Sequence, residues 1–132
     1  MTALNISPAI GSDLFTTSFD TGKLAGLTMS ELQTVREGAK LAADVLLGFL
    51  EQPRCSTYGT NFYNASGEAL NLLREAALDM ADAIEDEACR RKDAAGADAK
   101  LRAWILLRAR AEREDDEEGQ LLELVKIAGG EA

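Results

Sequence analysis

Hydrophobic and polar residues follow a helical period most clearly between Gly67 and Asp93. With about 3.6 residues per turn, the apolar side chains of this stretch fall in one sector of the helix, and most of its acids fall in the opposite sector. The apolar residues are Leu70, Leu73, Ala77, Met80, Ala81, Ile84 and Ala88. The pattern predicts a long helix with a buried side and an acidic side.

Another helix is predicted from Thr28 to about Glu51. Thr28 and Glu31 have the spacing of a capping box, in which each side chain accepts a hydrogen bond from the backbone of the other residue. Pro53 cannot continue a helix, so the helix should end before it. The residues expected to face inward are Leu32, Val35, Ala39, Ala42, Ala43, Leu46, Phe49 and Leu50. The small residues in the middle of this face favour a tight helix pair.

The C-terminal part of the chain predicts one or two further helices. Asp98 is a suitable N-cap for a helix that starts near Ala99. Residues 112–118 are all charged, and residues 120–127 are largely apolar again. A break at Gly119 would give a short fourth helix, and one long helix that crosses the acidic run is the alternative.

These segments predict an all-α protein, a small three- to four-helix bundle with a long central helix. The bundle domain comprises residues 28–128 in this prediction. Residues 1–27 form an irregular N-terminal arm, partly extended or flexible, in which residues 14–19 suit an extended strand-like segment. The arm has too many apolar residues for a tail that contacts nothing, so it should pack on its own bundle or on a second copy.

The chain of 132 residues carries a net charge of −9. Residues 1–67 have 6 acids and 4 bases, and residues 68–132 have 17 acids and 10 bases. This charge repels phosphate backbones and anionic membranes, so we expect neither direct nucleic-acid binding nor membrane binding. The N-terminal region shows no secretion signal, and no apolar run is long enough to cross a bilayer. We therefore expect a cytoplasmic protein, in which Cys55 and Cys89 are free thiols.

The chain contains no histidine, which restricts the chemistry that it could perform. Ser-His and Cys-His nucleophile pairs and the Glu-x-x-His ligands of di-iron bundles are excluded. A Mg²⁺-dependent nucleotide hydrolase built from carboxylates is the enzyme class that remains. The acids of residues 68–93 point away from the apolar sector, which argues against that site. We therefore expect a non-enzymatic protein with no cofactor, no catalytic residue and no metal ligand.

The segment 53–64 shows no helical repeat and gathers unusual side chains. Its candidate partner-binding residues are Arg54, Tyr58, Asn61, Phe62 and Tyr63. The aromatic side chains offer a large contact area with few torsions to restrict, and the other two can form directed hydrogen bonds. This set could hold a protein partner or stack on a base of a small nucleotide. Alternatively, the aromatic residues plug the end of an Ala-rich bundle.

Four acids of the long helix form a candidate acidic face: Glu75, Asp79, Asp82 and Asp86. A rigid row of carboxylates could imitate a phosphate backbone and occupy a nucleic-acid-binding groove. Small acidic proteins of phages and mobile elements inhibit host defences in this way, and this chain is similar to them in size and charge only. The simpler interpretation is a solvated face, because neighbouring arginine and lysine residues dilute the negative field.

The sequence favours a protein-binding regulatory or inhibitory module, with a phage or mobile element as one origin that fits its size and charge. Its expected partner is another protein, and a homo-oligomer is a further expectation. The first alternative is an acidic inhibitor that imitates nucleic acid and targets a host nucleic-acid-binding or defence protein. The second is a helical oligomer that binds a small ligand or nucleotide. All three stay open at this point.

Overall fold

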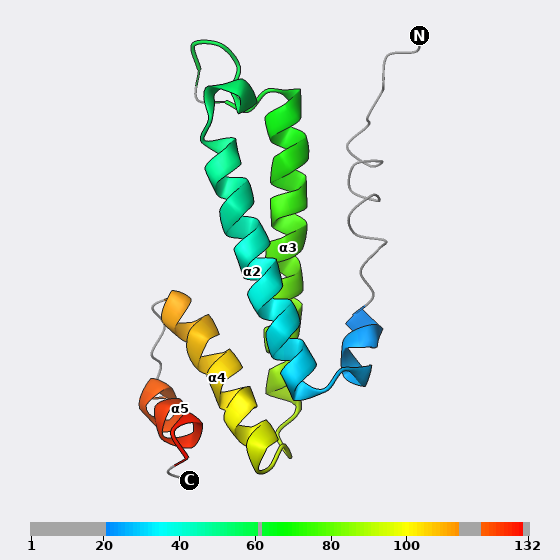
Figure 1. Cartoon of the computed structure of the whole chain (residues 1–132), viewed down its shortest axis with the longest axis vertical. Helices are drawn as coiled ribbons and strands as arrows, with labels where there is room; N and C mark the ends of the chain where they lie inside the picture. Colours follow the sequence, from blue (N-terminus) through cyan, green and yellow to red (C-terminus); the bar gives the residue numbers. More distant parts are fainter. Residues whose placement is uncertain (1–20, 61, 114–119, 131–132) are drawn as a thin grey trace. The chain divides into compact units, whose positions relative to one another are not determined.

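The computed structural model describes residues 21–60, 62–113 and 120–130, and this part of the chain is all-α (Figure 1). With η marking a 3-10 helix, the helices are η1 Thr21–Gly26, α2 Met29–Leu50, η2 Pro53–Cys55, α3 Ala65–Arg90, α4 Ala97–Glu112 and α5 Gln120–Ala128. The predicted fold class, a small all-α bundle with one long helix, is confirmed. Residues 14–19, predicted to be strand-like, lie outside the described residues.

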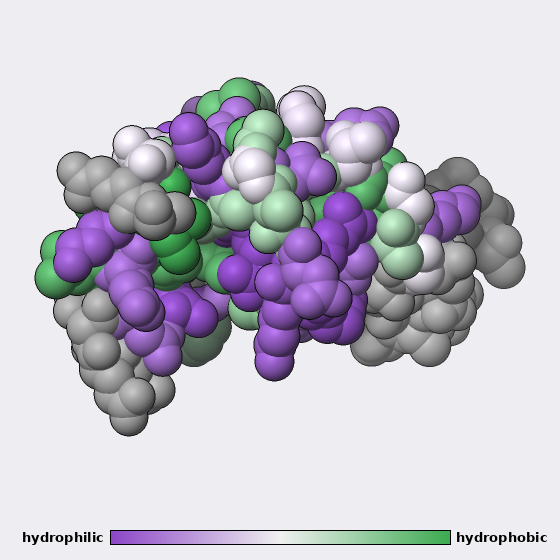
Figure 2. All heavy atoms as spheres, turned by 90° about the horizontal axis from the view of Figure 1, so that it is seen from below, coloured by the Kyte–Doolittle hydropathy of each residue, from purple (hydrophilic) through white to green (hydrophobic). Residues whose placement is uncertain are grey.

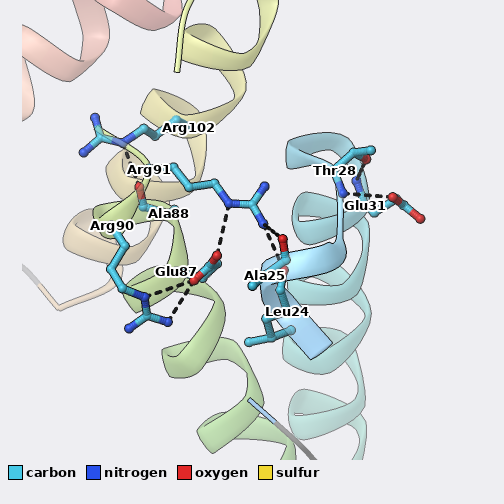
Figure 3. Close-up of polar contacts among 9 residues, drawn as sticks. All are labelled: Leu24, Ala25, Thr28, Glu31, Glu87, Ala88, Arg90, Arg91 and Arg102. Atoms are coloured by element: carbon cyan, nitrogen blue, oxygen red, sulfur yellow. Dashed lines mark hydrogen bonds and ion pairs between the residues drawn. The ribbon is translucent and has the colours of Figure 1, made fainter. Parts of the chain in front are cut away.

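Local sequence signals set both ends of α2. The Thr28 N–H donates to Glu31 Oε1 at 2.9 Å, and the Glu31 N–H donates to Thr28 Oγ1 at 3.1 Å (Figure 3). The predicted capping box is therefore present. Two contacts with Thr28 hold the pKa of the Glu31 carboxyl below its ordinary value. The larger cause is the hydrogen bond from the Thr28 N–H, and the smaller is the contact with the Thr28 hydroxyl. At its other end α2 stops at Leu50, before Pro53.

The start of α4 differs from the prediction. The helix begins at Ala97, and Gly96 occupies the N-cap position without a side-chain cap bond. Asp98 is therefore not the N-cap, because Gly96, with a φ of 60°, turns the chain two residues earlier. Asp98 falls in the first turn instead, where a negative charge is favourable. The helix ends at Glu112 and α5 begins at Gln120, while residues 114–118 of the acidic run lie outside the described part.

The described residues group into two compact units, and each contains a part of α2 and a part of α3. The hairpin unit comprises residues 37–81, which are the larger part of α2, the loop that follows it and the first part of α3. In this unit α2 and α3 run in opposite directions (Figure 1). Its buried apolar residues are Ala39, Ala43, Leu50, Cys55 and Ala81. The core of the hairpin unit is thus built mainly from alanine, as the sequence of α2 predicts at positions 39 and 43.

The terminal unit comprises residues 21–36 and 82–130 of the described chain. In this unit α4 packs against α5. Its buried apolar residues are Leu24, Met29, Leu32, Ile84, Ala88, Ala103, Ile105, Leu106, Ala109 and Leu124. Leu24 belongs to the predicted arm 1–27, of which the structure describes only residues 21–27. The division into an arm 1–27 and a bundle 28–128 stays a prediction.

Arginine side chains satisfy the backbone at the C-terminal end of α3 (Figure 3). Arg102 of α4 donates from Nε to the Ala88 carbonyl oxygen at 2.7 Å, and a terminal guanidinium nitrogen lies 3.3 Å from the Cys89 carbonyl oxygen. Arg91 donates to the Leu24 carbonyl oxygen at 2.9 Å and so ties η1 to the end of α3. The last carbonyls of a helix lack partners inside the helix, and a positive charge there also favours the helix dipole. Arg102 therefore caps the C-terminal end of α3, while Arg91 joins that end to η1.

Glu87 is 7 % exposed and binds Arg90, the last residue of α3, and Arg91, which follows the helix (Figure 3). Its carboxylate accepts from Arg90 Nε at 3.0 Å and from Arg91 Nε at 3.2 Å. Burial alone would raise the pKa of Glu87, but the hydrogen bonds and positive charges of the two guanidinium groups outweigh burial and hold the pKa below its ordinary value. A buried carboxylate is tolerated here because it stays ionised and paired.

Two further ion pairs link the last residue of α4, Glu112, and its C-cap, Arg113, to other parts of the terminal unit. Glu85 of α3 is 9 % exposed and accepts two bonds from Arg113, at 2.5 and 2.6 Å. Arg36 of α2 is 5 % exposed and donates to Glu112 Oε2 at 2.9 Å. The forked geometry at Glu85 matches the guanidinium group and favours one relative orientation of the helices that carry the pair.

Within the described part of the chain, no helix is both long enough and apolar enough to span a membrane.

Candidate protein-binding surface

The loop between α2 and α3 is ordered by its own backbone hydrogen bonds. After η2, Ser56 and Tyr63 form an antiparallel bridge, and the Thr57 N–H donates to the Phe62 carbonyl oxygen at 2.8 Å. The Thr60 N–H donates to the Thr57 carbonyl oxygen at 3.0 Å and closes the tip. Gly59 lies within this turn with a φ of +75°, a conformation that a residue with a side chain adopts at a cost. The loop is therefore a short hairpin rather than an irregular connection.

Asn64 fastens this hairpin to the start of α3. Its Oδ1 accepts from the Gly67 N–H at 2.9 Å, which makes Asn64 the N-cap of the helix. Its Nδ2 donates to the Arg54 carbonyl oxygen at 2.7 Å and lies 3.3 Å from the Ser56 carbonyl oxygen. Ser66 also lies near the start of α3, but the capping hydrogen bond comes from Asn64. One side chain thus holds both the helix start and the base of the loop.

Gly67 lets the loop approach α3 closely. A Cβ at this position would lie 2.2 Å from the Cys55 carbonyl oxygen, and 2.9 Å from Tyr63 Cβ. The Cys55 carbonyl oxygen also accepts from the Asn64 N–H at 2.9 Å. The Cys55 thiol is free and buried, while the Cys89 thiol is free and half-buried. Cys55 therefore contributes packing and a backbone acceptor at this crossing.

The loop presents its aromatic residues to solvent. Tyr58 is fully exposed, Phe62 is 77 % exposed and Tyr63 is 37 % exposed. The Arg54 guanidinium carbon lies 4.7 Å from the centre of the Phe49 ring at the end of α2, a cation–π contact. Asn61 lies outside the described residues. The exposure of Tyr58 and Phe62 argues against the interpretation that these side chains plug the end of the bundle.

A second apolar surface lies on α2, where we expected none. Leu41 is 66 % exposed, Val45 is 57 % exposed and Phe49 is 43 % exposed. Gly38, Ala42 and Gly48, on the same side of the helix, are exposed as well. The prediction that Ala42 and Phe49 face inward is wrong, because the buried side of α2 in the hairpin unit follows Ala39, Ala43 and Leu50. The arginine stacked on Phe49 connects this face to the loop.

The spacing of this face was visible in the sequence. Gly38, Leu41, Val45 and Gly48 recur every three or four residues, as one side of a helix does. Because α2 is apolar on two sides, the period alone does not identify the side that the core covers. We call the exposed residues Gly38, Leu41, Ala42, Val45, Gly48 and Phe49 the α2 face.

The four acids of the candidate acidic face are exposed: Glu75, Asp79, Asp82 and Asp86. Asn71 Nδ2 donates to Glu75 Oε1 at 3.1 Å, one turn away. Over the described ranges, no group of three or more cysteine, aspartate or glutamate side chains is arranged to hold a metal ion. Imitation of nucleic acid by these acids stays a prediction.

Exposed hydrophobic residues also occur in the terminal unit. Leu122 and Val125 of α5 are 61 % and 50 % exposed, and Trp104 of α4 is 44 % exposed. Figure 2 shows hydrophobic surface at the left and at the top of this face, and a hydrophilic surface in its lower middle. These positions lie on two helices, and the segments that adjoin these helices in the sequence contain no aromatic residue.

No protein-family model, curated protein or solved structure matches this chain.

Proposed function

We propose that the protein is a non-enzymatic binding module that regulates or inhibits another protein, and that it binds its partner through the hairpin unit. The observation that carries this proposal is the full exposure of Tyr58 and the 77 % exposure of Phe62 on a loop held by hydrogen bonds. Soluble proteins leave single apolar residues exposed without consequence. Two aromatic residues on one ordered loop, next to an apolar helix face, indicate an interaction site.

The order of the loop supports this function energetically. A flexible loop loses conformational entropy when it binds, and that loss weakens the complex. Here the Ser56–Tyr63 bridge, the turn at Thr57 to Thr60 and the side chain of Asn64 restrict the backbone before binding. Tyrosine and phenylalanine also have only two side-chain torsions to restrict. Most of the apolar area buried by a partner would then contribute to affinity.

The test compares single alanine variants in affinity capture from the native host. Tyr58→Ala and Phe62→Ala should each lose the protein that co-purifies with the wild type, or bind it at least about tenfold more weakly. Both side chains are exposed, so far-UV circular dichroism and the melting temperature should match those of the wild type.

Leu122→Ala is the matched control, because Leu122 is 61 % exposed but lies in the terminal unit. It should retain the co-purifying protein at the wild-type level. Retention of the same protein by all three variants would refute a role for the loop. Loss with Leu122→Ala alone would move the binding surface to α5.

A further inference from the structure

The α2 face has the spacing of a helix that packs along another helix. In a heptad numbered a to g, Gly38 and Val45 occupy position a, and Leu41 and Gly48 occupy position d, the two apolar positions. Ala42 and Phe49 lie at one edge of this stripe. All six residues are exposed and uncharged. The opposite side of α2 in the hairpin unit is already buried, so the helix carries one covered and one bare apolar stripe.

The two glycines leave space for a second backbone. An added Cβ at Gly38 or Gly48 would have nothing within 4 Å. Between them Leu41 and Val45 project from the surface, at 66 % and 57 % exposure. Small residues at the ends and large residues in the middle are suited to knobs-into-holes packing with a close approach at each end. From Gly38 to Phe49 the face is about 17 Å long, the length of about three helical turns.

The charged residues beside the α2 face indicate which kind of helix could pack on it. Asp44 and Glu51 are exposed at the edge opposite Ala42 and Phe49, where heptad helices carry the residues that select a partner. Lys40 lies one turn before Asp44 and about 40° further from the stripe, so this edge is acidic on balance. An antiparallel pair of identical chains would bring this acidic edge against its own copy, which is unfavourable. A partner helix with lysine or arginine along its flank would instead meet an opposite charge.

We propose that the α2 face is the docking site for an amphipathic helix of a different protein, with an apolar heptad stripe and basic residues on the flank that meets Asp44 and Glu51. This assignment rests on the proposed function and specifies the chemistry of the partner. Arg54, which stacks on Phe49, joins this face to the loop that carries the exposed aromatic residues.

The direct test uses two synthetic three-heptad peptides with the same Leu/Ala stripe and with either lysine or glutamate on the flank. Fluorescence anisotropy at low salt should show at least about fivefold tighter binding of the lysine peptide, and high salt should remove the difference. Asp44→Lys combined with Glu51→Lys should reverse the preference. Val45→Lys should weaken binding of the lysine peptide by at least about tenfold. Leu122→Lys is the control and should bind the lysine peptide like the wild type.

Each other outcome overturns the assignment. Equal binding of the two peptides, no binding of either, or an unchanged affinity for Val45→Lys would each exclude a basic helix on this face. A wild-type dimer in analytical ultracentrifugation that becomes a monomer with Val45→Lys would identify a second copy as the occupant. If Val45→Lys still captures the partner that Tyr58→Ala loses, the proposed function stands and only the helix docking fails.

Discussion

Replacing Gly67 with alanine should destabilise the hairpin unit, although alanine is the better helix former. The new Cβ would lie 2.2 Å from the Cys55 carbonyl oxygen and 2.9 Å from Tyr63 Cβ. The first of these contacts is with backbone, which cannot rotate away as a side chain can. The loop and the first turn of α3 must therefore separate.

The size of the effect follows from the bonds at this crossing. The Cys55 carbonyl accepts from the Asn64 N–H at 2.9 Å, and the Gly67 N–H donates to Asn64 Oδ1 at 2.9 Å. Overpacking costs about 1–3 kcal/mol, and the loss of an N-cap costs about 1 kcal/mol. The higher helix propensity of alanine relative to glycine offsets about 1 kcal/mol of this loss. The free energy of unfolding should thus fall by about 1–3 kcal/mol in Gly67→Ala.

Urea unfolding followed by far-UV circular dichroism measures this difference. Gly38→Ala is the matched control, because it makes the same change in the middle of α2, where an added Cβ has nothing within 4 Å. It should raise the free energy of unfolding by up to about 1 kcal/mol. The two variants should therefore shift the urea midpoint in opposite directions. A gain in stability for Gly67→Ala would refute the close approach described above.

Two further predictions concern single polar side chains. Asn64→Ala removes the N-cap of α3 and the hydrogen bonds to the base of the loop. It should lower the free energy of unfolding by about 2 kcal/mol in the same urea assay, and an effect below about 0.5 kcal/mol would contradict the role given to Asn64. The folded-state pKa of Glu87 is below its unfolded value, so its contribution to stability is present above about pH 4.3 and is lost as the pH falls through the folded pKa. Glu87→Gln should therefore lower the free energy of unfolding by about 1 kcal/mol at pH 7 and reduce the loss of stability below about pH 4.3. Urea midpoints measured over a range of pH test this, and the same pH dependence in both proteins would exclude the linkage.

Local signals explain how much of the fold could be predicted. The capping box at Thr28 and Glu31, the proline after α2 and the asparagine before α3 each act within a few residues, and each sets a helix end in the structure. Gly96 is the exception, since the sequence does not show that its φ is positive. Once that turn is made, α4 begins before its expected cap.

Packing explains what could not be predicted. Glu85 is buried because Arg113 reaches it from 28 positions away in the chain. No periodicity shows such a pair, and a glutamate on a helix is ordinarily assigned to solvent. The α2 face was missed for a related reason. Its stripe has the same apolar period as the buried stripe, and which of the two is covered depends on where α3 lies.

The candidate site was predicted in part. The aromatic residues of the segment 53–64 do not fit a helical repeat and so predict a contact surface, and the structure exposes Tyr58 and Phe62. The sequence left open whether they face solvent or fill the end of the bundle. The backbone bridge between Ser56 and Tyr63 decides this, because it fixes the loop as a hairpin with its tip directed outward.

The two glycines of the α2 face affect the free protein as well. Both face solvent within a helix, where each makes the helical state less favourable by about 1 kcal/mol than alanine would. Local opening of a helix is easiest where such residues occur, so the segment between Gly38 and Gly48 is a weak part of α2 while its outer side is bare. Contact with a second backbone along that side would suppress the opening. Recognition and the stiffening of α2 would then be a single event.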